Sequence, residues 1–397
     1  MDSYPGGSLE IPLKRLARFR SGGSIRGEEI HETGTYPVFG GNGIRGYTET
    51  SNIEGTNLLV GRQGALAGNV HFVAQPAYAS EHALIASISG LVLPRYLYYL
   101  LIQMNLNQYS QAAAQPGISA SVIEKVRISI PSHIEVQERM AAFLDAKTAE
   151  IDVVVEKLRR QRELLERYKR ELIAHTVTKG LDPEAPMKES GLQWIGEIPE
   201  AWQIQTLSNM TDENKTKNKD LSESNLLSLS YGSIIRKDIN LAFGLLSASF
   251  DTYQIVNPGY VVLRMTDLQN DKRSLRSGYV SERGIITGAY IGLIPGAQID
   301  PRFLGWMMRA YDLKKIFYGL GSGVRQSLNY SELRKLPTLL PPLREQEEIA
   351  DFLDSKTAEI DGLIGDIDRQ MELLGAYRKQ VINDVVTGKV RVSEEAA

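Results

Sequence analysis

Three glycines near the start of this chain have the spacing of a nucleotide-binding loop, but the segment that follows them does not suit that chemistry. Gly41, Gly43 and Gly46 form a G-x-G-x-x-G pattern, and the next residues read YTETSNIEG, which predicts turns and extended chain. A dinucleotide site needs a helix there, because the helix N-terminus binds the pyrophosphate. We therefore expect a glycine-rich loop that exposes Asn42 and Arg45, and no nucleotide site.

Other motifs that could support catalysis are incomplete. Residues 257–260 read NPGY, which is similar to the NPPY motif of amino-methyltransferases, but the second proline is missing. A turn before a strand explains this run. The sequence has no G-K-S or G-K-T phosphate loop. The five histidines, which show no metal-ligand spacing, are His31, His71, His82, His133 and His175. We expect no cofactor, no metal site and no catalytic centre.

Side chains that can read nucleic acid are a different set. Arg or Lys bonds the edge of guanine, Asn or Gln bonds adenine, and aromatic or small groups pack on the thymine methyl. Neighbouring glycines let a backbone approach a groove closely. The candidates in the first half of the chain are Arg26, Asn42, Arg45, Arg62, Gln63 and Gln115. Those in the second half are Tyr231, Arg236, Lys237, Arg264, Arg273, Arg276, Arg325 and Gln326.

For each of these residues taken singly, a solvated surface charge is an equally good interpretation. The sets are stronger than their members, and we expect roughly half of each set to lie on a DNA-facing surface.

The elements that must position these side chains follow from a repeat. Residues 143–152 read FLDAKTAEID and residues 352–361 read FLDSKTAEID, with a single Ala/Ser difference. Short structural repeats have periods of roughly 20–50 residues, and this period is about half of the chain. The sequence therefore predicts one domain-plus-helix module used twice.

Apolar residues recur every seven positions around each decapeptide, which predicts two long helices over residues 131–180 and 341–390. We place a second core row three residues after the first, with a glutamine in each helix that could fix register. The predicted seam consists of Leu144, Ile151, Leu158, Gln161, Leu165, Tyr168, Leu353, Ile360, Ile367, Gln370, Leu374 and Tyr377. Because the patterns match in phase and length, we expect an antiparallel coiled coil about a pseudo-two-fold axis, a spacer on the order of 60 Å long.

The two globular sections, residues 1–130 and 201–340, resemble each other weakly and in the same order. Each has a strand-like run after a glycine, and each later has a Pro-Arg pair, at Pro94 and Pro301, that opens an aromatic-rich helix. Short strands mixed with one or two helices predict an α+β fold for each section. A linker at 181–200 and a tail at 391–397 complete the expected organisation.

Composition sets broad limits. The 397 residues include no cysteine, which excludes disulfides and thiolate sites and agrees with a cytoplasmic protein. The start of the chain has neither a basic region nor an apolar core, so we expect no signal peptide. The most apolar stretch, residues 83–102, is interrupted by Pro94 and Arg95, which argues against a membrane helix.

The net charge of −3 hides an uneven distribution. Residues 201–340 carry 17 basic and 12 acidic groups, and residues 1–130 carry 10 and 9. Residues 341–397 carry 7 and 13. Since the acidity lies outside the globular sections, the distribution permits nucleic-acid binding by those sections.

Several segments together resemble the specificity subunit of type I restriction-modification systems. They are PPLREQEEIADFLDSKTAEID, the linker KGLDPEAPMKESGLQWIGEIPEAW, the closing VTGKV, and the head segment YPVFGGNGIRGYTET with GRQGALAGNV. The resemblance covers essentially the whole chain. One departure is that the first helix begins after PSHIEVQ where the second has PPLREQ.

This resemblance implies a non-enzymatic DNA-recognition subunit. Two target-recognition domains would each read one half of a split double-stranded DNA target, with a gap set by the helix pair. The helices would dock two adenine methyltransferase (M) subunits, and restriction (R) subunits would join the complex.

A structural adaptor is the alternative interpretation. A coiled coil joining two protein-binding heads would need the same repeat but no DNA-facing Arg and Gln loops. A DNA reader's affinity should fall steeply with salt, which separates the two.

Overall fold

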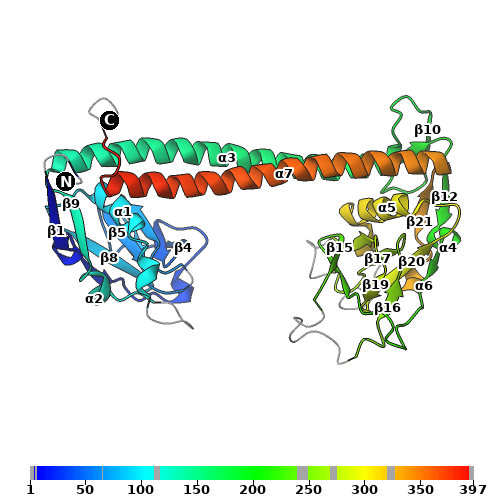
Figure 1. Ribbon diagram of the computed structural model, residues 1–397, viewed down its shortest axis with the longest axis horizontal. Coiled ribbons are helices and arrows are strands. Elements are labelled where there is room, and N and C mark those ends of the chain that lie inside the picture. Colours follow the sequence, from blue (N-terminus) through cyan, green and yellow to red (C-terminus); the bar gives the residue numbers. More distant parts are fainter. Residues whose placement is uncertain are drawn as a thin grey trace. The chain divides into compact units, whose positions relative to one another are not determined.

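The computed structural model describes residues 4, 7–64, 66–110, 117–238, 249–268, 275–319 and 327–392. The chain divides into two compact units, Met1–Arg159 with Asp368–Ala397, and Arg160–Ile367. The boundaries fall inside the two long helices, which are drawn in Figure 1. Each unit therefore contains one globular section and a part of both helices.

A four-stranded antiparallel sheet is the centre of the first globular section. Its strands lie in the order β2–β8–β5–β6, β3 pairs with β4 and β7, and β1 pairs with β9. The strands are β1 (Ser8–Pro12), β2 (Ala17–Ser21), β3 (Tyr36–Gly40), β4 (Gly43–Thr48), β5 (Asn57–Gly61), β6 (Val70–Val73), β7 (Tyr78–Ala79), β8 (Ala83–Ile88) and β9 (Arg127–Pro131). The helices are η1 (Leu13–Arg15), η2 (Gly27–Glu29), α1 (Pro94–Gln103), η3 (Leu106–Tyr109) and α2 (Ala120–Ile123).

The second globular section has a sheet with the matching order β13–β20–β17–β18. Its strands, with those of the preceding linker, are β10 (Met187–Glu189), β11 (Glu197–Pro199), β12 (Gln203–Thr206), β13 (Thr211–Glu213), β14 (Leu227–Ser230), β15 (Ser233–Arg236), β16 (Gln254–Val256), β17 (Val261–Leu263), β18 (Ser277–Tyr279), β19 (Gly284–Ile286), β20 (Ile291–Pro295) and β21 (Pro337–Leu340). Its helices are α4 (Leu207–Met210), α5 (Pro301–Leu313), η4 (Ile316–Gly319) and α6 (Tyr330–Leu333). The predicted α+β fold is confirmed in both sections.

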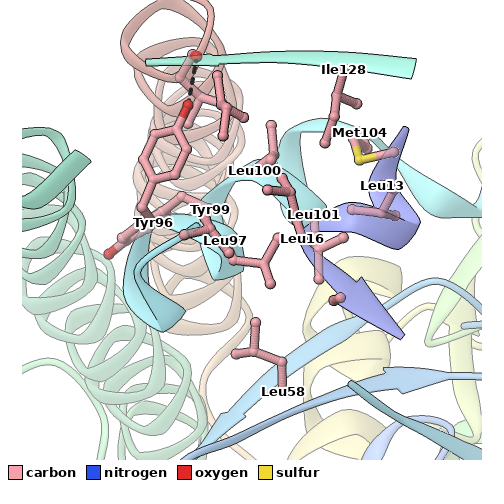
Figure 2. Close-up of a cluster of buried hydrophobic side chains, with 14 of the residues drawn as sticks. Leu13, Leu16, Leu58, Tyr96, Leu97, Tyr99, Leu100, Leu101, Met104 and Ile128 are labelled. Atoms are coloured by element: carbon pink, nitrogen blue, oxygen red, sulfur yellow. Dashed lines mark hydrogen bonds between the residues drawn. The ribbon is translucent and has the colours of Figure 1, made fainter. Parts of the chain in front are cut away.

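Pro94 and Pro301 begin α1 and α5, as predicted. A proline suits the first helical position because its missing N–H would have no partner there. Figure 2 shows how α1 is buried: Leu97, Leu100 and Leu101 lie among side chains from η1, β5 and β9. The same cluster includes residues of both long helices, and so does the core cluster of the second section, so each section packs onto the helix pair.

The two long helices, α3 (Ile134–Lys179) and α7 (Leu343–Val386), run antiparallel within each unit. In the first unit Leu144 shares a core cluster with Ile382, and Arg378 pairs with Asp152 at 3.4 Å. In the second unit Lys169 pairs with Asp361 at 2.6 Å. The second ion pair joins the repeat equivalents of the first, because Asp361 corresponds to Asp152 and Lys169 to Arg378. The pairing of the two helices is therefore repeated within each unit down to single charges.

The phase predicted for the seam is wrong in one row. Leu144, Ile151, Leu353, Ile360 and Ile367 are buried, as expected for a core row. The second core row lies four residues after the first, not three: Thr148 and Thr357 are both 5 % exposed.

Four predicted seam residues therefore lie outside the seam. Tyr168 and Tyr377 are 53 % and 54 % exposed, and Gln161 and Gln370 are exposed as well. Core rows alternate spacings of three and four residues, and both spacings were consistent with the leucine row. The true second row in α3 reads Thr148, Val155, Arg162, Lys169 and Thr176, which is too polar to be recognised from composition.

A buried glutamine joins each section to its helix. Gln137 accepts a hydrogen bond from Leu93 N–H at 3.0 Å and donates to the Leu91 and Pro131 carbonyls at 3.3 and 3.1 Å. Gln346, its repeat equivalent, accepts from Asp300 N–H at 2.8 Å and donates to the Gln298 and Pro341 carbonyls at 3.1 and 2.8 Å. Both side chains are almost fully buried. Each amide therefore satisfies backbone groups on either side of the junction.

The decapeptide supplies a second anchor in each unit. Asp145 accepts hydrogen bonds from Arg95 Nε at 2.6 Å and from the Tyr99 hydroxyl at 2.5 Å. Asp354 accepts from Arg302 Nη1 at 3.2 Å and from Trp306 Nε1 at 2.8 Å. Burial, together with the bond to Asp145, raises the pKa of Tyr99 to about 12. The repeated aspartate is therefore a docking site for the helix that begins at the Pro-Arg pair.

The predicted linker, residues 181–200, is packed rather than loose. It contains the β10–β11 pair, and Ile195 and Ile198 belong to the same core cluster as Ile173 and Val177 of α3. Just beyond it, Trp202 is fully buried and donates a hydrogen bond to Glu345 Oε2 at 2.9 Å.

Replacing either junction glutamine by leucine should destabilise only its own unit. Gln137→Leu leaves one backbone N–H and two carbonyls without a partner in a buried place, which should cost roughly 2–4 kcal/mol. Hydrogen exchange should then accelerate in α1 and remain unchanged in α5, and Gln346→Leu should give the reverse. The exposed Gln161→Leu is the control. Equal acceleration in both helices would contradict independent junctions.

Candidate nucleic-acid interface

The glycine-rich segment of the first section is a tight hairpin, β3–β4, with no helix after it. Gly40 pairs with Gly43, so Gly41 and Asn42 form its tip. A Cβ added at Gly41 would lie 2.8 Å from the Gln63 carbonyl oxygen, which requires glycine there. The expected exposure of Asn42 and Arg45 agrees with the structure, although Arg45 lies within β4 rather than in a loop.

This close approach gathers several predicted residues at one edge of the section. Asn69 Nδ2 donates to Asn42 Oδ1 at 3.2 Å. Arg62 Nη1 donates to Ser21 Oγ at 3.1 Å, and Gln63 Oε1 lies 3.0 Å from His82 Nδ1. A cleft of 480 Å³ opens beside them, lined by Ser21, Arg62, Gln63, Leu84, Gly117, Ile118, Ser119, Ala120 and Ser121. Asn42, Arg62 and Gln63 thus form one polar surface rich in donors and acceptors.

Arg26 is placed differently and Gln115 is not placed. The Arg26 side chain is exposed and forms an ion pair with Glu29 at 3.7 Å. An exposed pair of this kind contributes little to stability. Gln115 lies outside the described residues.

In the second section the equivalent hairpin in chain order is β14–β15. Tyr231 at its tip is 80 % exposed. At its base Arg236 pairs with Glu282: Nε donates to Oε1 and Oε2 at 2.9 and 2.8 Å, Nη2 also donates to Oε2, and the carboxylate raises the pKa of Arg236. Lys237 is exposed beside it. Arg264 is half-buried after β17, and the remaining predictions Arg273, Arg325 and Gln326 lie outside the described residues.

The prediction that Arg276 faces DNA is wrong, because its side chain is fully buried. Its guanidinium donates to the carbonyls of Arg264, Thr266 and Asp267 at 3.3, 2.7 and 3.1 Å, and to the Tyr318 hydroxyl at 3.2 Å. Its backbone N–H donates to Asp312 Oδ2 at 2.6 Å. Burial raises the pKa of Asp312, and the Arg276 N–H opposes that shift. Arg276 therefore organises the chain after β17 from inside.

Arg309 of α5 was not among the residues predicted from the sequence. Its Nη2 donates to the carbonyls of Gly232 and Ser277, the latter at 2.6 Å, and its Nε donates to Ser277 Oγ at 3.1 Å. Burial lowers its pKa. A cation in the middle of an aromatic-rich helix was the available signal, since it needs a buried partner.

The remaining motifs have structural explanations. The NPGY run is a turn before β17, in which Gly259 N–H donates to the Val280 carbonyl at 2.9 Å. In the part of the chain that the structure describes, no three His, Asp or Glu side chains gather as a metal site. Across the same residues, no helix is long and apolar enough to cross a membrane.

One side of the helix pair is left uncovered and carries the misplaced second row. We call this row, Lys147, Val154, Gln161, Tyr168 and their equivalents Lys356, Leu363, Gln370 and Tyr377, the outer row. Within each unit, residues of this row from the two helices lie near one another. Accordingly Glu359 and, more weakly, Tyr168 of the other helix raise the pKa of Lys356. Glu150 and Tyr377 act on Lys147 in the same way.

Each unit has its own apolar patch on this side. The second unit exposes Leu164, Tyr168 and Leu363, at 55 %, 53 % and 47 %. The first unit exposes the equivalents Leu373, Tyr377 and Val154, at 60 %, 54 % and 43 %. An exposed apolar patch of this kind is a candidate contact surface for a partner.

Comparisons with known proteins agree on one family. Residues 7–160 match the family model described as type I restriction modification DNA specificity domain. The Escherichia coli type I restriction enzyme EcoprrI specificity subunit is 40 % identical over 137 residues, 34 % of this chain and 34 % of that protein. The MjaVIII specificity subunit of Methanocaldococcus jannaschii is 24 % identical over 85 % of this chain and 79 % of its own length.

Solved structures show the same fold. A chain in a structure of complex assembly and conformational transition of the type I R-M system covers 98 % of this chain and 99 % of its own length, with a TM-score of 0.61 and 14 % identity. The HsdS subunit from Thermoanaerobacter tengcongensis covers 98 % of both chains, with a TM-score of 0.50 and 13 % identity.

Arg276→Met should destabilise the second section without acting on a DNA surface. Methionine replaces the volume but leaves the carbonyls of Arg264, Thr266 and Asp267 without donors, which should cost about 3–5 kcal/mol. Chemical denaturation measures this loss, with the exposed Lys237→Met as control. A variant of normal stability that had lost only DNA binding would contradict the structural role.

Proposed function

The chain belongs to the family of type I restriction-modification specificity subunits, and we propose that it reads a bipartite DNA target, with residues 1–130 and 201–340 as its two target-recognition domains. The two sections share a sheet order and an attachment to the helices, yet present different side chains at their exposed hairpins. That combination of a matched scaffold and unmatched surfaces is the observation that supports the proposal. The alternative, a coiled-coil adaptor that joins two protein-binding heads, is not favoured, because residues 7–160 match a DNA specificity domain.

The reading surface of the first domain would be the edge formed by Asn42, Arg62 and Gln63. Arginine recognises guanine, and the amides recognise adenine. The gap between the half-sites would be set by α3 and α7. The chain itself would perform no chemistry: it would supply specificity to an adenine methyltransferase and, in the restriction complex, to R subunits in the cytoplasm.

The partner surface would be the two apolar patches beside the outer row. Since the patches are repeat equivalents, one in each unit, they would bind two copies of the same methyltransferase subunit in equivalent ways. Each patch is flanked by a Lys–Glu ion pair, Lys147–Glu150 or Lys356–Glu359.

Arg62→Ala should weaken recognition of one half-site only. Loss of one bidentate base contact should lower affinity for that half roughly tenfold. The measurement is binding of the assembled methyltransferase complex to DNA with either half-site scrambled. Lys237→Ala, in the other domain, is the comparison variant: a phosphate contact carries no sequence information, so we expect it to weaken binding whichever half-site is scrambled. Equal losses at both halves for Arg62→Ala would refute modular reading.

The variant Leu164→Ser with Tyr168→Ser should release one methyltransferase copy and keep the other. Removing the apolar surface of one patch lowers affinity there and leaves the equivalent patch intact. Native mass spectrometry counts the bound subunits, and Leu373→Ser with Tyr377→Ser is the matched pair. Two copies retained in both variants would place the interface elsewhere.

A further inference from the structure

Tyr231 occupies a backbone position that does not favour tyrosine. Ser230 pairs with Ser233, so Tyr231 and Gly232 alone form the hairpin tip, with φ values of 44° and 85°. Two positive φ values are typical of a type I′ turn, which prefers Asn-Gly, Asp-Gly or Gly-Gly. A tyrosine in the left-handed region is strained, because its Cβ approaches the following carbonyl. The ring is exposed and contributes little to the core.

Contacts from α5 and β18 hold the hairpin that carries Tyr231 in place. Arg309 reaches from α5 to the Gly232 carbonyl while it also bonds Ser277 of β18. A Cβ added at Gly278 would lie 2.6 Å from Leu229 and 2.9 Å from Ile234, so β18 packs directly under the hairpin. These contacts therefore hold Tyr231 in its strained backbone conformation. Strained residues that are held in this way are often functional.

We propose that the Tyr231 ring makes an apolar contact with the bases of the half-site read by residues 201–340, and that Arg309 is its positioning residue. This inference rests on the proposed function. The Tyr231 ring at the hairpin tip is exposed, and a rigid aromatic group there can pack against base edges at a small entropic cost. Lys237, exposed on the same hairpin, supplies a cation for the adjoining phosphates.

The two domains then differ in chemistry at equivalent places. The first domain presents the amide of Asn42 at its hairpin tip, a group that bonds base edges, whereas the second presents an aromatic ring. Equivalent hairpins with unlike tips would read unlike bases, which would make the two halves of the target different.

The test compares Tyr231→Gly with Tyr231→Phe in the assembled methyltransferase complex. Glycine removes the ring and relieves the turn, so we expect unchanged or higher thermal stability together with a roughly tenfold loss of DNA affinity. Phenylalanine keeps the ring and should keep the affinity. The loss should disappear on DNA whose second half-site is scrambled, and methylation by the glycine variant should become less selective at that half only.

The outcomes separate the inference from the function on which it rests. If the wild-type complex selects its target and Tyr231→Gly does so equally well, the role of Tyr231 is overturned and the proposed function stands. If the wild-type complex selects no DNA sequence, both are overturned.

The positioning role of Arg309 is tested by whether its effect depends on the presence of Tyr231. Arg309→Lys, or the milder Ser277→Ala, should reduce selectivity at the second half-site when Tyr231 is present. In the Tyr231→Gly background either change should have no further effect on selectivity. If the losses of selectivity from the two changes were additive, Arg309 would contribute only to the stability of the fold, and its positioning role would be overturned.

Discussion

Each globular section depends on one buried glutamine at its junction with the helix pair. Gln137 and Gln346 each bond backbone groups from the turn before the docking helix and from the strand end before the long helix. A buried amide is costly unless all its groups find partners, so this contact admits little variation in angle or register. Its exact repetition, together with the aspartate of the decapeptide, lets two diverged sections attach in the same way.

Much of this scaffold could be predicted from the sequence because it consists of periodic and local signals. The leucine row, the proline-initiated helices and the α+β character of the sections were all predictable from the sequence. The second row of the seam was not, because Thr148, Arg162 and Lys169 do not resemble core residues. Ion pairs between the two helices fix the positions of such residues in the seam. Lys169 pairs with Asp361, and Arg378 pairs with Asp152. Such partners lie about two hundred residues away and leave no local pattern.

The candidate interface was less predictable, and for a related reason. The sequence shows where an arginine occurs along the chain, but not whether its side chain points to solvent or into the core. Arg62 and Arg276 looked alike in sequence, yet the first lines an open cleft and the second holds three carbonyls inside the domain. Arg309 was missed because its neighbours in sequence are core residues of α5. The exposed tip of Tyr231 could have been noticed, since Tyr-Gly between two strand-like runs is an unusual choice for a tight turn.

The division of the long helices between the units has a consequence for how the chain is made. The second unit is continuous in sequence, from Arg160 to Ile367, whereas the first also needs Asp368–Ala397. Ile382, Val385 and Val386 fill the first core, and the hydroxyl of Tyr4 bonds the Val386 carbonyl at 2.8 Å. Domains generally fold in the order of their synthesis. Here the order differs: the first unit lacks Ile382, Val385 and Val386 until that part of α7 has been made, whereas all residues of the second unit precede them in the chain.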